Sequence, residues 1–384
     1  MNTEIFNNAL ARVQLQRLPL QHHQSLRAWD AADELLLKHI AQQQLAQPHS
    51  KVLVINDHFG ALSVSLAAAS IEQLSHWGDS HISQLATAHN LKLNQLTTPI
   101  HYLSSVQSLS DCYDLIVIKL PKVSALLETQ LNGLAAQLTA KGQIIAAGMC
   151  KHMPMSSYRI FERLVGPTTT SKAEKKARLI FPQAVHQQAQ PLPYPITFTE
   201  PSLGLTLSNH ANVFSKESLD IGARFFIQHF KQLPSAEHII DLGCGNGVLG
   251  IMARRFMQQQ GVNSQIHFVD ESYMAVASAQ LNYQQAYHNL DNCSFHHSEC
   301  LSQLADISAD LILCNPPFHQ QHTVGDYLAK RMFKHSYSSL KPQGQLWVVA
   351  NKQLPYAPYL KNLFGHCTKI ASNKKFVIYQ AIKQ

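Results

Sequence analysis

Short apolar runs alternate with segments of helical spacing along this 384-residue chain. In the second half the apolar runs lie at 238–244, 265–270, 310–315 and 344–350, and helical spacing covers 248–259, 272–286 and 326–340. The runs are rich in Val, Ile and Leu and lack strict polar alternation, as expected of parallel strands buried on both faces. The pattern predicts a doubly wound α/β domain with a mostly parallel sheet.

The first half repeats this order of elements. The run KVLVIND (51–57) takes the place of HIIDLGC, and DLIVIKLPK (114–122) resembles DLILCNPPF (310–318) in pattern and position. A helix is expected over 81–93, after a run that ends in the acid Asp79. Asp79 lies about 23 residues after Asn56, as Asp270 lies 29 residues after Asp241, so we expect the two acids to correspond. Internal repetition of this length predicts two doubly wound domains in tandem.

A proline-dense stretch separates the two halves. Residues 181–201 contain Pro182, Pro191, Pro193, Pro195 and Pro201. Because proline fixes φ and lacks a backbone N–H, we expect an extended linker here rather than a core element. The expected domains are therefore 1–185 and 195–384.

The charge balance favours an anionic partner. The chain has 31 Lys and Arg against 24 Asp and Glu, which gives a net charge of +7 and a pI near 9.0. Such a charge suits nucleic acid, but many basic proteins bind none, so charge alone leaves the partner open.

Compartment and metal content follow from what the sequence lacks. The seven cysteines are widely spaced and form no disulfide framework, which favours a reducing compartment. The N-terminus has no signal-peptide core, and no apolar run approaches the roughly 20 residues that span a bilayer. We therefore expect a cytoplasmic protein without a membrane partner, and the scattered histidines predict no metal site.

A glycine-rich turn follows the first run of the second half. Asp241 precedes Gly243, Gly245 and Gly247, and a second acid, Asp270, ends the next run. The glycines allow a tight turn and close approach of a ligand to the backbone. Two acids suit a ligand with an ammonium group and a ribose diol, which favours S-adenosylmethionine. A dinucleotide site, which uses the second acid but does not need Asp241, is the alternative.

The sequence Asn315-Pro316-Pro317-Phe318 follows the third run. In open α/β sheets, ligands bind at the carboxyl ends of the strands. The Asn315 side-chain oxygen and the Pro316 carbonyl can both accept from one planar NH2 group, and Phe318 offers a ring on which a base can stack. We interpret the segment as a site for a target amine, with a plain proline-rich turn as the alternative.

These motifs carry a resemblance. The second half resembles class I S-adenosylmethionine-dependent methyltransferases that act on exocyclic amines, and the segment 209–226 resembles the Val-Phe-Ser…Leu-Asp-x-Gly segment of bacterial ribosomal RNA guanine-N2 methyltransferases. With 28–37, 166–180, 269–282 and 315–322, the whole chain is similar to the RlmG family. That family methylates a guanine of 23S ribosomal RNA (position 1835 in the family's naming), and the related RsmC family shares the two-half plan.

The resemblance implies a role for each motif residue. The methionine part of S-adenosylmethionine would be held by Asp241, Gly243, Gly245 and Gly247. Asp270 would bind the ribose and Glu299 the adenine, with Ser298 as the alternative adenine contact. Residues expected to close over the cofactor are Phe214 and Asp220. The target guanine would be held by Asn315, Pro316 and Phe318.

The first half departs from this pattern. Its turn has one glycine, Gly60, preceded by the bulky His58 and Phe59, so we expect a degenerate domain that has lost cofactor and chemistry. We interpret it as RNA-binding, with phosphate contacts from Lys119, Lys122, Lys172, Lys175, Lys176 and Arg178, the last four on a strand. A solvated basic face is the alternative.

Other functions share parts of this pattern. An Asn-Pro-Pro-aromatic loop accepts any planar NH2, so a protein-glutamine N5 or adenine N6 methyltransferase is an alternative, as is a small-subunit ribosomal RNA enzyme. A non-enzymatic RNA-binding assembly factor fits the charge but not the intact motifs. The basic charge and the degenerate first copy favour 23S ribosomal RNA, either naked or in a large-subunit precursor.

Overall fold

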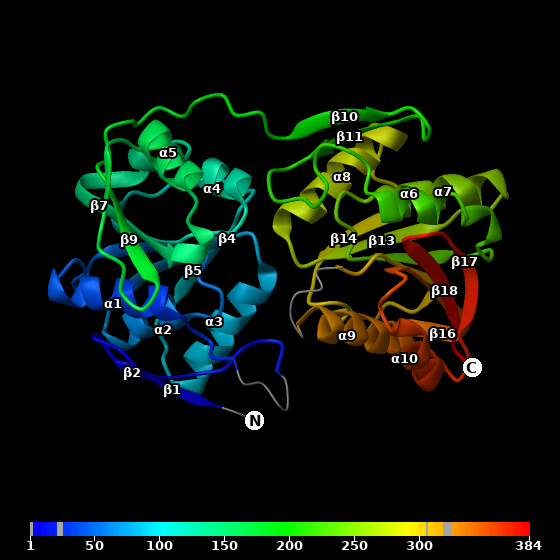
Figure 1. The fold of residues 1–384 in the computed structure, drawn as a ribbon, viewed down its shortest axis with the longest axis horizontal. Helices are drawn as coiled ribbons and strands as arrows, with labels where there is room; N and C mark the ends of the chain where they lie inside the picture. The colour runs from blue at the N-terminus through cyan, green and yellow to red at the C-terminus, as the bar shows by residue number, and fades with distance from the viewer. Residues whose placement is uncertain (1–2, 21–25, 305, 318–323) are drawn as a thin grey trace. The chain divides into compact units, whose positions relative to one another are not determined.

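The computed structural model describes residues 3–20, 26–304, 306–317 and 324–384, without the side chains of 324–326. Its contacts divide the chain into two compact units, Met1–Pro193 and Tyr194–Gln384 (Figure 1). The division falls within the proline-dense stretch.

The first unit is built on a seven-stranded sheet in the order β5-β4-β3-β6-β7-β9-β8. Its strands are β3 (Lys51–Ile55), β4 (Gln73–Gly78), β5 (Ile100–Ser104), β6 (Tyr113–Lys119), β7 (Leu138–Met149), β8 (Thr168–Thr170) and β9 (Ala177–Pro182). Its α-helices are α1 (Ala31–Gln42), α2 (Ala61–Ala68), α3 (His81–Leu93), α4 (Ser124–Leu131) and α5 (Met155–Leu164). A separate hairpin joins β1 (Glu4–Asn7) and β2 (Arg12–Leu15).

The second unit repeats this order with the sheet β14-β13-β12-β15-β16-β18-β17. Its strands are β12 (His238–Leu242), β13 (Gln265–Asp270), β14 (Cys293–His297), β15 (Ala309–Cys314), β16 (Leu340–Asn351), β17 (Thr368–Ser372) and β18 (Phe376–Ile382). Its α-helices are α6 (Ile221–Ile227), α7 (Val248–Gln259), α8 (Tyr273–Tyr287), α9 (Val324–Ser339) and α10 (Tyr356–Phe364), and the hairpin is β10 (Ile196–Glu200) with β11 (Leu205–Asn209).

Helices cover both faces of each sheet, which explains why the strands are apolar without strict alternation. On β12, Ile239 packs into the cluster that includes α6, α7 and α8, whereas Ile240 packs into the cluster of α9 and α10. Figure 1 shows these two helix layers on opposite sides of the second sheet. The predicted tandem doubly wound fold is confirmed.

The helix starts are duplicated as well. Asp30 caps α1 and Asp220 caps α6, each accepting a hydrogen bond from a backbone N–H of the first turn. Ser80 and Ser272 cap α3 and α8 in the same way. A side-chain oxygen at this position satisfies an N–H that has no partner within the helix, so the matching caps fix matching helix starts.

The predicted linker is shorter than expected. The stretch 181–201 was predicted to be extended and outside any core element, but β9 takes its first residues and β10 takes Ile196–Glu200. β9 pairs antiparallel with β7. Of the five prolines, Pro182 ends β9, Pro191, Pro193 and Pro195 lie between β9 and β10, and Pro201 follows β10. No helix in the described part of the chain is long and apolar enough to cross a membrane.

Candidate active site

The glycine-rich turn joins β12 to α7, and all three of its glycines have positive φ, at 70°, 53° and 79°. Gly247 needs its lack of a side chain for packing, because a β-carbon there would lie 2.8 Å from the Ala279 β-carbon. A β-carbon at Gly245 would meet no atom of the described residues within 4 Å. The turn therefore opens at Gly245 onto a space that a ligand can enter.

Two acids flank this turn. Asp270 accepts hydrogen bonds from the backbone N–H groups of Gly245 and Ser272, both at 3.0 Å, and so ties the turn to the end of β13. Asp241 is fully buried, and its Oδ2 accepts from the Gly250 N–H at 2.8 Å. Among the described residues its Oδ1 has no hydrogen-bond partner. This buried acceptor fits an ammonium group of a ligand, which would supply the missing donor.

Burial, together with a smaller contribution from the nearby Asp270 charge, raises the pKa of Asp241 to about 8. Between about pH 4, where an unfolded Asp titrates, and about pH 8, the folded protein therefore holds a proton that the unfolded chain has lost. The free energy of unfolding should fall as pH rises through this window, and D241N should lose this dependence. Denaturant unfolding of both cofactor-free proteins at pH 5 and pH 8 tests this, and an equal difference between them at the two pH values would contradict it.

Asn315 lies directly after β15 and is held by the cap of α6. Its Nδ2 donates to Asp220 Oδ2 at 3.1 Å, and the same oxygen accepts from the Ala223 N–H at 2.8 Å. The Asn315 Oδ1 is buried and has no partner among the described residues. Pro316 is buried beside it, and Phe318 lies outside the described residues. The loop thus presents an oriented acceptor that fits an N–H donor.

Strand register brings these groups to one edge of the sheet. Leu242 of β12 pairs with Val269 of β13 and with Cys314 of β15. The residues that follow these three parallel strands, which include the glycine turn, Asp270 and Asn315, therefore emerge side by side, about 4.8 Å apart from strand to strand. Most of the predicted cofactor and amine motifs are brought together.

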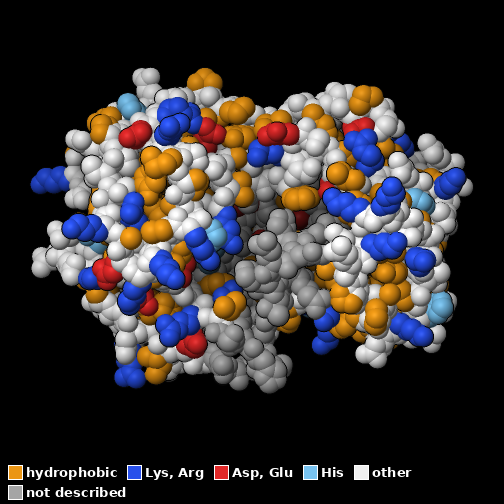
Figure 2. Space-filling view, in the orientation of Figure 1, with side chains coloured by type: hydrophobic (Ala, Val, Ile, Leu, Met, Phe, Trp, Pro, Cys, Tyr) orange, Lys and Arg blue, Asp and Glu red, His pale blue; other side chains and the backbone are white. Residues whose placement is uncertain are grey.

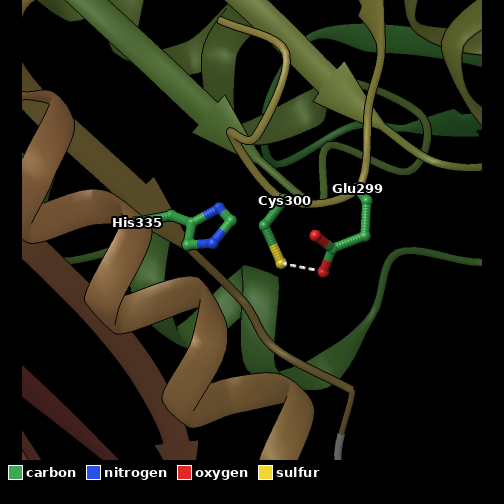
Figure 3. A group of neighbouring side chains, drawn as sticks. All are labelled: Glu299, Cys300 and His335. Atoms are coloured by element: carbon green, nitrogen blue, oxygen red, sulfur yellow. Dashed lines mark hydrogen bonds between the residues drawn. The ribbon is translucent and has the colours of Figure 1, made fainter. Parts of the chain in front are cut away.

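Glu299 is engaged differently from the expectation. Both of its carboxylate oxygens accept from Arg331, at 2.6 and 2.7 Å, and the Cys300 thiol donates to one of them at 3.3 Å. Figure 3 shows Glu299 and Cys300 beside His335, whose Nδ1 accepts from the Leu301 N–H. Glu299, Cys300 and His335 lie close enough together to hold a metal ion, but Arg331 already neutralises the Glu299 carboxylate. Adenine contact by Glu299, or by the buried Ser298, stays a prediction.

Phe214 and Asp220 were expected to cover the cofactor. Phe214 is 63% exposed, which is unusual for so large an apolar side chain. Its segment is fixed to α8, because the His210 N–H donates to Ser278 Oγ at 2.9 Å. The Asp220 carboxylate accepts a hydrogen bond from Asn315. The sequence does not reveal this bond, because the two residues lie 95 positions apart.

The first unit can be aligned with this site through its strand ladders. Ile55 pairs with both neighbouring strands as Leu242 does in the second unit. The alignment puts Val54 in the place of Asp241 and His58 in the place of Gly245. The buried acid is thus lost, and an imidazole stands where the active turn is open.

The acid expected to match Asp270 is displaced. Gly78 ends β4 where Asp270 ends β13, and Asp79 follows one residue later. Asp79 accepts a hydrogen bond from Ser105 Oγ at 2.5 Å. The equivalence of Asp79 with Asp270 was wrong, because the spacing between apolar runs does not determine which residue ends a strand.

Lys119 stands in the place of Asn315, but it is buried. Its ammonium lies 3.0 Å from Asp30 Oδ1 and 2.6 Å from Asp33 Oδ1. Burial opposes its charge, but Asp33 and Asp30 outweigh this effect and raise the pKa of Lys119. The prediction that Lys119 contacts RNA phosphates was wrong: the amide-to-cap bond of the second unit is replaced here by an ion pair that fills the site.

The other predicted RNA contacts lie elsewhere on the first unit. Lys122, Lys172 and Lys176 are exposed. Lys175 is exposed and lies 2.7 Å from Glu34. Residues 171–176 form the turn between β8 and β9, not a strand, and only Arg178 lies on β9 itself. Lys172, Lys175 and Lys176 therefore project from the turn of the β8–β9 hairpin, whereas Lys122 lies in the turn between β6 and α4.

Comparison with known proteins identifies the family. Residues 3–186 match the RLMG N-terminal domain, and residues 204–380 match the methyltransferase small domain. A relative from Pseudomonas paraeruginosa (strain DSM 24068 / PA7), the ribosomal RNA large subunit methyltransferase G, is 43% identical over 380 residues, which cover 99% of this chain and 100% of the relative. The chain belongs to the family of ribosomal RNA large subunit methyltransferase G. The family predicted from the sequence is thus confirmed.

Two further proteins place the chain within this family and its fold. The ribosomal RNA large subunit methyltransferase G of Erwinia tasmaniensis is 42% identical over 386 residues, which cover 96% of each chain. The T. thermophilus 16S rRNA N2 G1207 methyltransferase (RsmC), solved in complex with AdoMet and guanosine, has a TM-score of 0.76 at 20% identity and covers 100% of this chain and 98% of its own. The fold of both units of this chain therefore resembles nearly the whole of that structure.

Proposed function

We propose that this protein transfers a methyl group from S-adenosylmethionine to the exocyclic N2 of a guanine in 23S ribosomal RNA. Its membership in the family supports the substrate class. The observation that carries the proposal is the buried, unpartnered Asn315 Oδ1 beside the glycine-rich turn. An oxygen fixed in this way fits one hydrogen of a planar amine, which is the group that guanine N2 offers.

The residues around the turn fit S-adenosylmethionine, which supplies an electrophilic methyl group when bound. Gly245 leaves the room, Asp241 Oδ1 offers an acceptor for the ammonium, and Asp270 lies at the strand end where a ribose diol would be held. Gly243 and Gly247 shape the turn. Phe214 would cover this site from the segment before α6.

The protein's own part in the reaction is positioning. Asn315 Oδ1 and the Pro316 carbonyl would accept from the two hydrogens of the amine and keep its lone pair directed at the methyl group, with Phe318 stacked on the base. Orientation of this kind supplies a large share of rate enhancement in two-substrate reactions. Because guanine N2 is covered in paired RNA, the target base must be unpaired or flipped out.

The first unit would bind the RNA, naked or in a large-subunit precursor, through Lys122, Lys172, Lys175, Lys176 and Arg178. Lysine and arginine side chains are spread over the face of this unit seen in Figure 2. Lys119, being buried, has no part in this contact. A ribosomal substrate places the activity in the cytoplasm.

RNA contact by the lysines of the β8–β9 hairpin should change the salt dependence of binding. Changing Lys172, Lys175 and Lys176 to Ala should weaken RNA binding and flatten the plot of log affinity against log salt by roughly 2, because each phosphate contact on single-stranded RNA contributes about 0.7. Affinity for S-adenosylmethionine should not change. The control replaces Lys51, Lys92 and Lys141, three other exposed lysines of this unit, with Ala. Equal slopes for both variants would show that the hairpin lysines are a solvated basic face without a specific role in RNA binding.

Transfer of labelled methyl to defined substrates tests the function itself. Purified 23S ribosomal RNA, 16S ribosomal RNA and ribosomal protein should be offered separately, followed by nucleoside analysis of the product. Label in N2-methylguanine of 23S RNA is expected. Label in 16S RNA, in N6-methyladenine or in a glutamine side chain would support the corresponding alternative, and RNA binding without any transfer would support an assembly factor.

A further inference from the structure

The last part of the chain contains no acidic residue. Residues 327–384 hold ten of the 31 Lys and Arg and none of the 24 Asp and Glu. The cations are Lys330, Arg331, Lys334, Lys341, Lys352, Lys361, Lys369, Lys374, Lys375 and Lys383. The basic character of the catalytic unit is therefore concentrated in its last 58 residues, which carry a net charge of +10. On the face shown in Figure 2, this unit, on the right, has many blue side chains and few red ones.

Three of these lysines lie at the edge of the sheet that carries the candidate active site. Lys352 directly follows β16, and Lys374 and Lys375 directly precede β18. β16 runs parallel to β15, so its end lies at the same edge as Asn315. β18 is antiparallel to β16, so its beginning lies there too. We refer to Lys352, Lys374 and Lys375 as the edge lysines.

The edge lysines stand close together and close to the site. The Lys352 N–H donates to the Lys375 carbonyl at 2.9 Å, which joins the two turns. Cys314 pairs with Val348, so Lys352 lies one strand to the side of Asn315 and three residues further along, at about 11 Å, and Lys375 on the next strand lies at about 14 Å. An RNA strand that brings a base to Asn315 passes within reach of flexible side chains of this length.

Their turn is held in place while their ammonium groups remain available. Asn373 Oδ1 accepts from the N–H groups of Lys375 and Phe376, at 2.8 and 2.7 Å, and fixes the turn before β18. All three edge lysines are exposed, and none has an ion-pair partner among the described residues. Glu299 and Asp310 pair with other cations of this segment, Arg331 and Lys341.

We propose that the edge lysines bind RNA phosphates next to the target guanine. This inference rests on the proposed function, because it assigns a second contact surface for the same RNA on the catalytic unit. Phosphate contacts fix the register of a nucleic acid without reading its sequence. The edge lysines would thus hold the backbone next to an extruded base, and the β8–β9 hairpin of the first unit would provide a separate RNA contact.

The test compares two triple variants of the full chain. One changes Lys352, Lys374 and Lys375 to Ala. The control changes Lys231, Lys334 and Lys361, exposed lysines of the same unit away from this edge, and removes the same charge. Binding of a naked 23S fragment that contains the target is measured from low to physiological salt, together with methylation kinetics.

The edge variant should flatten the salt slope by about 2, at about 0.7 per contact, and raise KM for RNA. Its kcat at saturating RNA and its affinity for S-adenosylmethionine should match the wild type, and the control should keep the wild-type slope. Equal slopes for both variants would overturn the proposal. So would a loss seen only on ribosomal particles, which would indicate an acidic protein surface. If the wild-type protein binds the fragment but methylates no RNA, the proposed function is wrong. The salt slopes of the two variants then still decide whether the edge lysines bind RNA.

Discussion

Replacing Gly245 with Asp should abolish S-adenosylmethionine binding while the fold remains intact. Gly245 has φ of 53°, a conformation that Asp tolerates better than most residues, and its missing β-carbon faces open space. The new side chain would enter the ligand space and bring a charge beside Asp270. Calorimetric titration should show one site per wild-type chain and none in G245D.

A matched variant separates this effect from backbone strain. Gly261 has φ of 75° and also faces open space, but it lies in the turn after α7. G261D adds the same group in the same backbone region and should bind cofactor normally. Wild-type affinity in G245D would show that the ligand lies elsewhere. Two sites in the wild-type chain would show that the first unit has kept its own.

In the first unit, protein side chains occupy the place that corresponds to the ligand site of the second unit. Asn56 takes the place of Gly243, and its side chain donates to the Lys119 carbonyl and to Gln130 Oε1. Lys119 in turn reaches Asp30 and Asp33 of the first helix. Removing the carboxylates from a buried cation is costly, so these contacts hold the Lys119 ammonium and the Asn56 side chain in the place that the second unit leaves for ligands.

The local signals in the sequence predicted the elements well. The helix over 248–259 and the strand over 265–270 have the expected bounds, because a glycine turn and an N-capping Ser272 mark their limits. The glycine turn itself, with Asp241 before it, was located because close ligand approach requires these residue types next to one another. Signals of this kind are contained within about ten residues.

The errors share a physical cause, which is partners that lie far apart in the chain. The burial of Lys119 depends on Asp30 and Asp33, roughly 90 positions earlier. A lysine's sequence context does not show whether its ammonium meets solvent or two carboxylates. The strands at both ends of the proline-dense stretch depend in the same way on partners in β7 and β11.

Replacing Asn315 with Ala should leave S-adenosylmethionine binding unchanged but lower single-turnover methylation by a factor on the order of 10²–10³, the usual loss for one catalytic hydrogen-bonding group. The reason is the loss of the buried Oδ1 acceptor at the target amine. Rapid-quench assays with labelled cofactor and saturating RNA measure this step. Nearly normal turnover would remove Asn315 from the amine site.

Asp220 gives this prediction a second, independent readout. Its Oδ2 accepts from Asn315 Nδ2, so it acts through Asn315 by fixing which amide atom faces the amine. D220A should therefore slow single-turnover methylation less than N315A does, and the double variant should be no slower than N315A alone, because removing the amide leaves Asp220 nothing to orient. Loss of the α6 cap will lower stability by about 1 kcal/mol, which unfolding measurements report separately from turnover. Additive losses in the double variant would mean that Asp220 acts on the reaction by another route, such as the cofactor contact expected from the sequence.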